Sequence, residues 1–147
     1  MATGHMLTNT GKQYLMQGKW ETTSGTTIQA KLLQGTQNTA ADTAAEVADI
    51  ATFTSLLANG TTECTATNYV AKTVTRVNAT LDGTNDRSNL DASDIVWTAL
   101  GGAVNNTLIG VAIVDGTALL SVDWFASSIT TNGGDLTYAI ADLYRAA

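Results

Sequence analysis

The densest group of potential metal ligands is a run of acidic and amide side chains in the second half of the chain. Its members are Asp82, Asn85, Asp86, Asn89, Asp91 and Asp94. Hard oxygen ligands on a flexible loop are what Ca²⁺ requires. The spacing does not match an EF-hand, because glycine directly follows Asp82 and no glutamate stands at the twelfth position. We therefore favour a solvated loop whose side chains bond to their own backbone turns, and we predict no metal site.

Catalytic chemistry has few candidate residues. Asp123, beside Trp124, is the only acid set within an apolar segment, whereas hydrolysis by carboxylates requires two acids across a cleft. Cys64 is the single cysteine and His5 the single histidine, and no serine occupies a Gly-x-Ser-x-Gly turn. We expect Asp123 to face solvent or to pair with a cation. The sequence thus predicts a protein that is not an enzyme, with no catalytic residues and no cofactor.

Aromatic side chains could instead form a sugar-binding platform. The candidates are Trp20, Trp97, Trp124, Tyr69, Tyr138 and Tyr144. Such a platform requires exposed rings that are roughly coplanar, but these residues are far apart in the chain and are set within apolar segments. We expect them in the core or at a subunit interface.

The elements that would position these residues are mainly strands. Three segments rich in β-branched and aromatic residues, separated by turn residues, predict a meander: 95–100, 108–114 and 118–125. Alternation of apolar and polar residues predicts three further strands: 26–33, 65–77 and 135–142.

Two short helices and two loops complete the pattern. A helix is expected at 7–17, capped by Thr8 or Asn9 and ended by Gly18 in the left-handed conformation. A second is expected at 44–59, where several threonines and a serine leave a broken helix or coil open. Residues 35–43 and 81–89 are expected to be exposed loops.

These elements predict one mainly β domain at residues 7–147. The expected architecture is an antiparallel β-sandwich, or a jelly-roll-like fold, with one or two short helices, because no βαβ rhythm is present. Residues 1–6 contain Gly-His-Met, and we interpret them as an N-terminal arm or a cloning remnant.

Charge and hydropathy limit the possible partners. The net charge is -6, and the seven cationic side chains are scattered along the chain, which argues against nucleic-acid binding. Apolar runs are too short for a membrane span, and the N-terminus lacks the pattern of a secretory signal. We therefore expect no membrane partner and synthesis in a cytoplasm.

Short motifs along nearly the whole chain give it a family resemblance. They are Leu-Thr-Asn-Thr-Gly-Lys at 7–12, the strand at 27–33, Thr-Asn-Tyr at 67–69, Asp-Ala-Ser-Asp-Ile-Val-Trp at 91–97, Asn-Thr-Leu-Ile-Gly at 106–110, the strand at 119–125 and Gly-Gly-Asp at 133–135. In this order they resemble small virion structural proteins of tailed bacteriophages.

The resemblance implies an auxiliary coat protein with a β-sandwich core. Its expected role is decoration, or cementing, of the outer surface of the phage head, with the major capsid protein as partner and a homo-oligomer, often a trimer, as the assembly. The expected location is the virion, assembled in the host cytoplasm. Expected contact segments are the N-terminal residues up to Leu7, the 35–43 loop and the loop from Asp82 to Asn89. The alternatives are a tail, neck or fibre component of the virion, and a carbohydrate-binding β-sandwich module.

Overall fold

The computed structural model describes residues 4–19, 28–37, 41, 43–58, 60–84, 87–140 and 144–146, with 76–82, 87–91 and 144–146 described as backbone only. The helices are α1 (Asn9–Met16), α2 (Ala44–Ala48) and α3 (Phe53–Leu56). The strands are β1 (Gly4–Leu7), β2 (Ile28–Gly35), β3 (Thr61–Glu63), β4 (Lys72–Thr73), β5 (Arg76–Asp82), β6 (Arg87–Ala92), β7 (Ile95–Leu100), β8 (Thr107–Asp115), β9 (Ala118–Thr130), β10 (Gly134–Tyr138) and β11 (Tyr144–Ala146).

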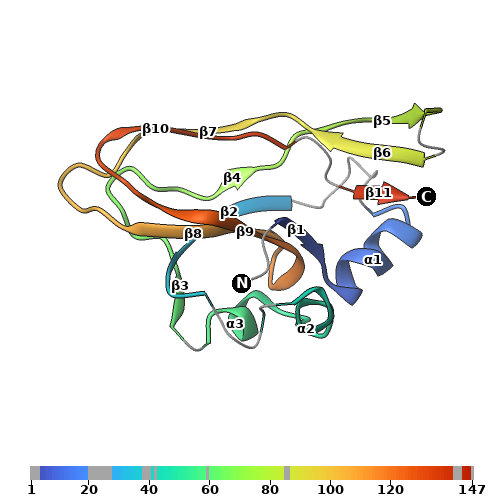
Figure 1. Cartoon of the computed structure of the whole chain (residues 1–147), viewed down its shortest axis with the longest axis horizontal. Helices are drawn as coiled ribbons and strands as arrows, with labels where there is room; N and C mark the ends of the chain where they lie inside the picture. Colours follow the sequence, from blue (N-terminus) through green and yellow to red (C-terminus); the bar gives the residue numbers. More distant parts are fainter. Residues whose placement is uncertain are drawn as a thin grey trace.

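A six-stranded antiparallel sheet forms the centre of the molecule. Its order is β1-β9-β8-β2-β3, and β4 pairs with the same edge of β2 as β3 does. Above it lies a second β layer, made of β10 paired with β7 and of a three-stranded sheet in the order β11-β6-β5 (Figure 1). The prediction of a mainly β, antiparallel sandwich with a few short helices is confirmed.

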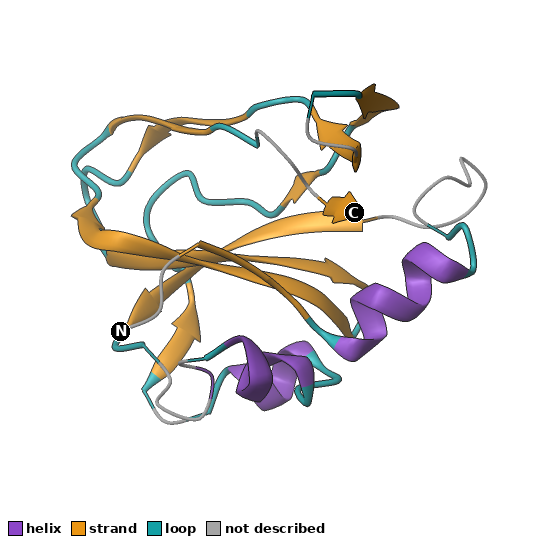
Figure 2. Cartoon of the chain, turned by 45° about the vertical axis from the view of Figure 1, so that its right-hand side comes forward, coloured by secondary structure: helices purple, strands orange, loops and turns teal. Residues whose placement is uncertain are grey.

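Both faces of the central sheet are covered. One face packs against β7 and β10 through a core that includes Trp97, Leu100, Leu32 and Ile113. Helices α2 and α3 cover the other face through Phe53 and other buried side chains (Figure 2). Because β8 lies in the middle of the sheet, six of its nine residues are buried, including every residue from Gly110 to Val114, which explains the apolar run in its sequence.

Helix α1 packs against β9 beside the sheet edge. Thr8 caps it as expected, and Gly18 follows it with a φ of 64°. A side chain at Gly11 would collide with the backbone of Leu120, so glycine is required where the helix approaches the strand.

The predicted meander is wrong in its pairing. β8 and β9 form a hairpin, but β7 pairs with β10 and contributes to the other layer. Residues 101–106 cross between the two layers. The exposure pattern of β7 gives the reason, because Trp97 is buried while Val96 is exposed, so this strand has one face in solvent.

Other expected elements also differ. The segment at 65–77 is not one strand: Asn68 adopts a φ of 64° in a turn, and strand structure resumes only in β4 and β5. Most of the expected loop at 81–89 belongs to the paired strands β5 and β6. Residues 85–86, between these strands, lie outside the described residues. The helix expected at 44–59 is broken into α2 and α3, because Thr52 caps a new helix. The last predicted strand, 135–142, ends at Tyr138; residues 139 and 140 are not strand, and 141–142 lie outside the described residues.

The N-terminal segment contributes to the sheet. β1 pairs with β9 from Gly4↔Trp124 to Leu7↔Ser121, and Met6 is buried among side chains of the helix-covered face. Part of the segment that we interpret as an arm or a cloning remnant is therefore an edge strand in this structure.

Candidate functional site

The candidate calcium ligands do not form a described site. Asp94 accepts a hydrogen bond from the backbone N–H of Ile140 at 3.3 Å, a residue distant in the chain and not, as we expected, part of its own turn. Asp82, Asn89 and Asp91 lie on β5 and β6, whose side chains in this region are not described, and 85–86 lie outside the described residues. Within the described residues, no three acidic, histidine or cysteine side chains cluster as a metal site would require.

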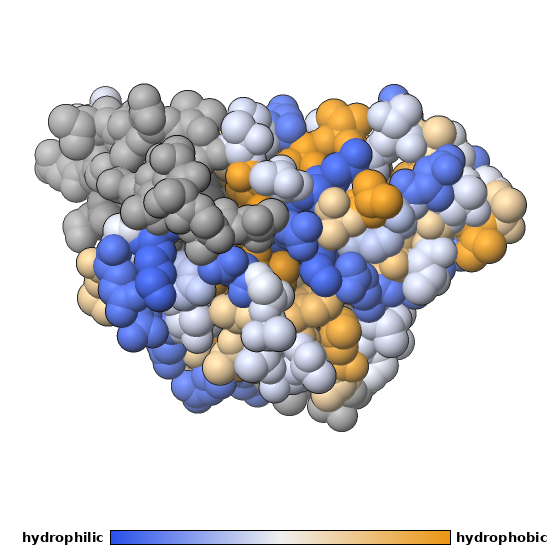
Figure 3. Space-filling model, turned by 180° about the vertical axis from the view of Figure 1, so that it is seen from behind, coloured by the Kyte–Doolittle hydropathy of each residue, from blue (hydrophilic) through white to orange (hydrophobic). Residues whose placement is uncertain are grey.

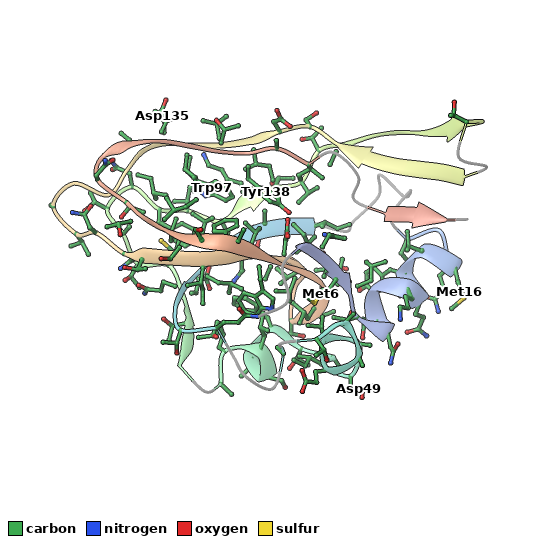
Figure 4. The ribbon with its side chains drawn as sticks, in the orientation of Figure 1. Met6, Met16, Asp49, Trp97, Asp135 and Tyr138 are labelled. Atoms are coloured by element: carbon green, nitrogen blue, oxygen red, sulfur yellow. The ribbon has the colours of Figure 1, made fainter. Side chains whose placement is uncertain are left out.

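Asp123 takes part in a contact between the two β layers. Its Oδ2 accepts a hydrogen bond of 2.7 Å from the hydroxyl of Tyr138, which points from β10 toward the central sheet (Figure 4). Burial, the charge of Asp123 and this hydrogen bond raise the pKa of Tyr138 above its usual value near 10. The phenol therefore remains a donor at neutral pH. Asp123, which we expected to face solvent or to pair with a cation, is therefore bonded to a tyrosine of the other layer.

The single cysteine is buried. Its Sγ lies 3.3 Å from Oδ1 of Asn106, and burial raises the pKa of the Cys64 thiol. A neutral thiol in such a place is a poor nucleophile. His5 lies exposed on β1, opposite Asp123 in the strand register, and is not adjacent to Cys64.

The described tryptophans belong to the core. Trp97 is fully buried and its Nε1 donates to Val70 O at 2.8 Å, while Trp124 donates to Ala41 O at the same distance. Tyr69 and Tyr138 are only partly exposed, Trp20 lies outside the described residues, and the side chain of Tyr144 is not described. The expectation that these rings form a core is confirmed for Trp97 and Trp124, which therefore cannot form a platform.

Tyr69 closes a gap in the edge of the central sheet. Between the points where β3 and β4 pair with β2, the N–H of Leu32 donates to the Tyr69 hydroxyl at 3.3 Å. That hydroxyl donates to Oε1 of Glu63 at 2.9 Å, and Glu63 also forms an ion pair of 3.2 Å with Lys31. Burial, followed by the interaction with Glu63, raises the pKa of Tyr69. This cluster has a structural role, because it satisfies a backbone donor that has no strand partner.

One end of the sandwich is a set of interlocked loops, which we call the loop end: 65–68, 101–106 and 131–134. Oδ1 of Asn106 accepts a hydrogen bond from Thr65 N at 2.7 Å. The backbone N–H of Asn106 donates to the hydroxyl of Thr131 at 2.8 Å, and the backbone N–H of Thr131 donates to the carbonyl of Asn106 at 2.9 Å. The loop end therefore ties the two β layers together.

The loop end also contains unusual backbone conformations. Ala99, at the adjoining end of β7, has a φ of 50°, which costs an alanine about 1–2 kcal/mol. Its N–H donates to Oδ1 of Asp135 at 2.8 Å, and its carbonyl accepts from Nδ2 of Asn68 at 2.9 Å. These two bonds hold the strained residue in place, so the loops that present Val104, which is 51% exposed, have a defined shape.

A pocket of about 400 Å³ lies where the pairing of β9 with β8 is interrupted. Trp124 pairs with Gly110 and Ile129 pairs with Leu108, so residues 125–128 of β9 all stand opposite the single residue Ile109. The lining consists of these bulged residues (Phe125, Ala126, Ser127, Ser128), two residues of β8 (Thr107, Ile109) and the end of β2 with the residues after it (Gly35, Thr36, Gln37). We call this the bulge pocket. Wide interruptions of pairing often occur beside functional sites.

Parts of the bulge pocket are predictable from the sequence, whereas the loop end is not. The 35–43 loop was expected to contact a partner, and its first three residues line the bulge pocket. The predicted strand 118–125 ended where the bulge begins, and Ala-Ser-Ser at 126–128 was the available signal. The loop end was not expected to be one unit, because its hydrogen bonds join residues far apart in the chain.

Comparisons with known proteins give no match, whether with protein-family models, curated proteins or solved structures. Among the described residues, the helices are all too short or too polar to cross a bilayer.

Proposed function

We propose that this chain is a structural protein of a tailed-bacteriophage virion, and specifically a decoration protein that binds the outer surface of the head as a homo-oligomer. The observation that carries the proposal is the loop end, a set of hydrogen-bonded loops held at one end of a two-layered β scaffold. Loops on a rigid scaffold are the usual place for interaction surfaces. The sequence resemblance to small virion proteins supports the same role.

The surface chemistry supports a polar interface. On the face seen in Figure 3, hydrophobic side chains lie in small groups between hydrophilic ones. Charged residues make up only 14% of the chain, so hydroxyl and amide groups supply much of its polarity. Such a surface can form many hydrogen bonds with a capsid lattice without burying unpaired charges.

The mechanism follows from selective binding. A protein that binds the assembled shell and not its free subunits stabilises the shell by mass action. At a free concentration of about 100 times Kd, the gain is about 2.7 kcal/mol per site. Closed symmetry of the decoration protein would allow one oligomer to join several coat subunits.

Light scattering combined with co-sedimentation tests the proposal. We expect an oligomer, a trimer in the simplest case, that pellets with emptied phage heads and not with free coat subunits. Equal binding to free subunits, or failure to pellet with heads, would refute the decoration role. Binding to isolated tails and not to heads would assign the protein to the tail or neck.

A matched pair of variants locates the contact surface. Val104→Asp places a charge on the loop end, and Met16→Asp places the same charge on α1 at the opposite end of the molecule, where Met16 is 82% exposed (Figure 4). Because both side chains are exposed, neither change should alter the unfolding temperature greatly. We expect Val104→Asp alone to abolish pelleting with heads. Equal loss in both variants would mean that the loop end is not the contact surface.

A further inference from the structure

We infer that the bulge pocket binds a neutral saccharide unit, a role separate from the proposed attachment to a head. The pocket volume of about 400 Å³ lies within the range of small-molecule sites. The pocket arises from the wide interruption in β9 pairing, so it is built by the fold and does not depend on the position of one flexible side chain.

Among the residues that the structure describes, those that line the pocket carry no charge. A phosphate or carboxylate would find no cation among these described lining residues, and the net charge of -6 would repel it. A cationic ligand would equally find no carboxylate among the lining residues. The ligand class is therefore uncharged.

The lining combines an apolar part with hydroxyl groups. Ile109, Phe125 and Ala126 supply the apolar part. Hydroxyl groups come from four residues: Thr36, Thr107, Ser127 and Ser128. Thr107, Ser127 and Ser128 are exposed, and within the described residues no hydrogen bond to another protein group is found at their hydroxyls.

Other threonine hydroxyls of the described chain are used differently. Thr61 Oγ1 donates to Thr36 O at 2.8 Å, Thr67 Oγ1 accepts from Val104 N at 2.9 Å, and Thr131 Oγ1 accepts from Asn106 N. These three hydroxyls are thus bonded within the protein, whereas the exposed hydroxyls of Thr107, Ser127 and Ser128 remain available to a ligand. A wholly apolar ligand would remove these available groups from water without replacing their hydrogen bonds.

A pyranose ring matches this combination of groups. Its C–H face can pack on Phe125 and Ile109, and its hydroxyls can exchange hydrogen bonds with serine and threonine hydroxyls, which rotate to donate or accept. Gln37, which carries an amide, is a further polar residue of the same lining.

NMR titration of the ¹⁵N-labelled protein tests the inference. The probes are glucose, galactose, N-acetylglucosamine and their disaccharides cellobiose, lactose and chitobiose, each at millimolar concentrations. We expect at least one probe to shift the amide signals of Thr36, Ile109 and Ala126–Ser128. Absence of shifts for the whole panel, or shifts confined to other residues, would overturn the inference. Shifts at the pocket with phenylalanine amide but with no sugar would also overturn it and would indicate a protein side chain as occupant.

Matched variants separate the pocket from the rest of the surface. The triple variant Thr107→Val, Ser127→Ala, Ser128→Ala removes three exposed lining hydroxyls and should weaken sugar binding by about tenfold or more. The control variant Thr98→Val, Thr137→Val removes exposed hydroxyls from the other β layer and should leave the affinity unchanged. Equal affinities in the triple variant, the control and the unmodified protein would refute the assignment of the site.

Discussion

The clearest stability prediction concerns two threonines that cap helices in different surroundings. Thr8 caps α1 and is fully buried, while Thr43 caps α2 and is exposed. The hydroxyl of Thr8 accepts from Gly11 N at 2.9 Å and donates to Leu119 O at 2.6 Å. The hydroxyl of Thr43 accepts from Glu46 N at 3.2 Å and donates to Oε2 of the same residue at 2.9 Å.

Replacing each threonine by valine removes the hydroxyl and keeps the shape. Loss of a cap costs about 1 kcal/mol, and we expect this value for Thr43→Val because water can replace its bonds. Thr8→Val also leaves the Leu119 carbonyl without its side-chain donor in a buried place, which adds about 1–3 kcal/mol. The expected total for Thr8→Val is therefore about 2–4 kcal/mol.

Urea unfolding followed by tryptophan fluorescence measures both values, because Trp97 and Trp124 are buried. The midpoint should fall further for Thr8→Val while the slope m stays constant. Thr8→Ser retains the hydroxyl and should recover most of the loss, apart from about 1 kcal/mol for the missing methyl group. Equal destabilisation by the two valine variants would refute the reasoning, since burial would then have no effect on the cap.

Three further predictions follow from the structure. Gly110→Ala should lower the free energy of unfolding by about 1–3 kcal/mol, because the added Cβ would lie 2.6 Å from a carbonyl oxygen of β9. The control Gly83→Ala places a Cβ where no atom lies within 4 Å, so the same urea unfolding assay should show almost no change. Tyr69→Phe should lower the free energy of unfolding by about 1–3 kcal/mol, because it leaves the N–H of Leu32 without an acceptor. Hydrogen exchange at that N–H should be faster in the variant than in the unmodified protein, and an equal or slower rate would contradict this. The pKa of Tyr138 is raised in the folded state, so the phenol loses its proton at a lower pH in the unfolded state than in the folded state. The free energy of unfolding should therefore fall as the pH rises above about 10. Tyr138→Phe should reduce that fall, and an unchanged pH profile would exclude Tyr138 as its cause.

Local features of the chain were predictable from its sequence. The apolar segment at 95–100 is β7, and the hairpin between β8 and β9 turns at Asp115-Gly116 as expected. Thr8 and Gly18 mark the two ends of α1. Each of these features depends on neighbouring residues: alternation of side chains, a capping hydroxyl, or a glycine with positive φ.

Pairing between strands was less predictable, because it depends on contacts distant in sequence. β7 has the composition of a strand that could pair with β8, yet it pairs with β10 in the other layer. The turn at Asn68 is stabilised by a hydrogen bond to the carbonyl of Ala99, thirty-one residues away, so nothing local marks it as an interruption of the expected strand. The pocket also depends on such contacts, since the bulge in β9 exists only relative to the register of β8.

The position of the bulge within β9 bears on how the pocket would bind a ligand. On one side, Trp124 is buried, pairs with Gly110 and donates its indole N–H to Ala41 O. On the other side, Thr131 follows the restored pairing and is bonded to Asn106 in the loop end. The four bulged residues are thus held between two anchored points. A pocket wall held in this way loses little conformational entropy when a ligand binds, so even a small saccharide, which offers few contacts, can bind with measurable affinity.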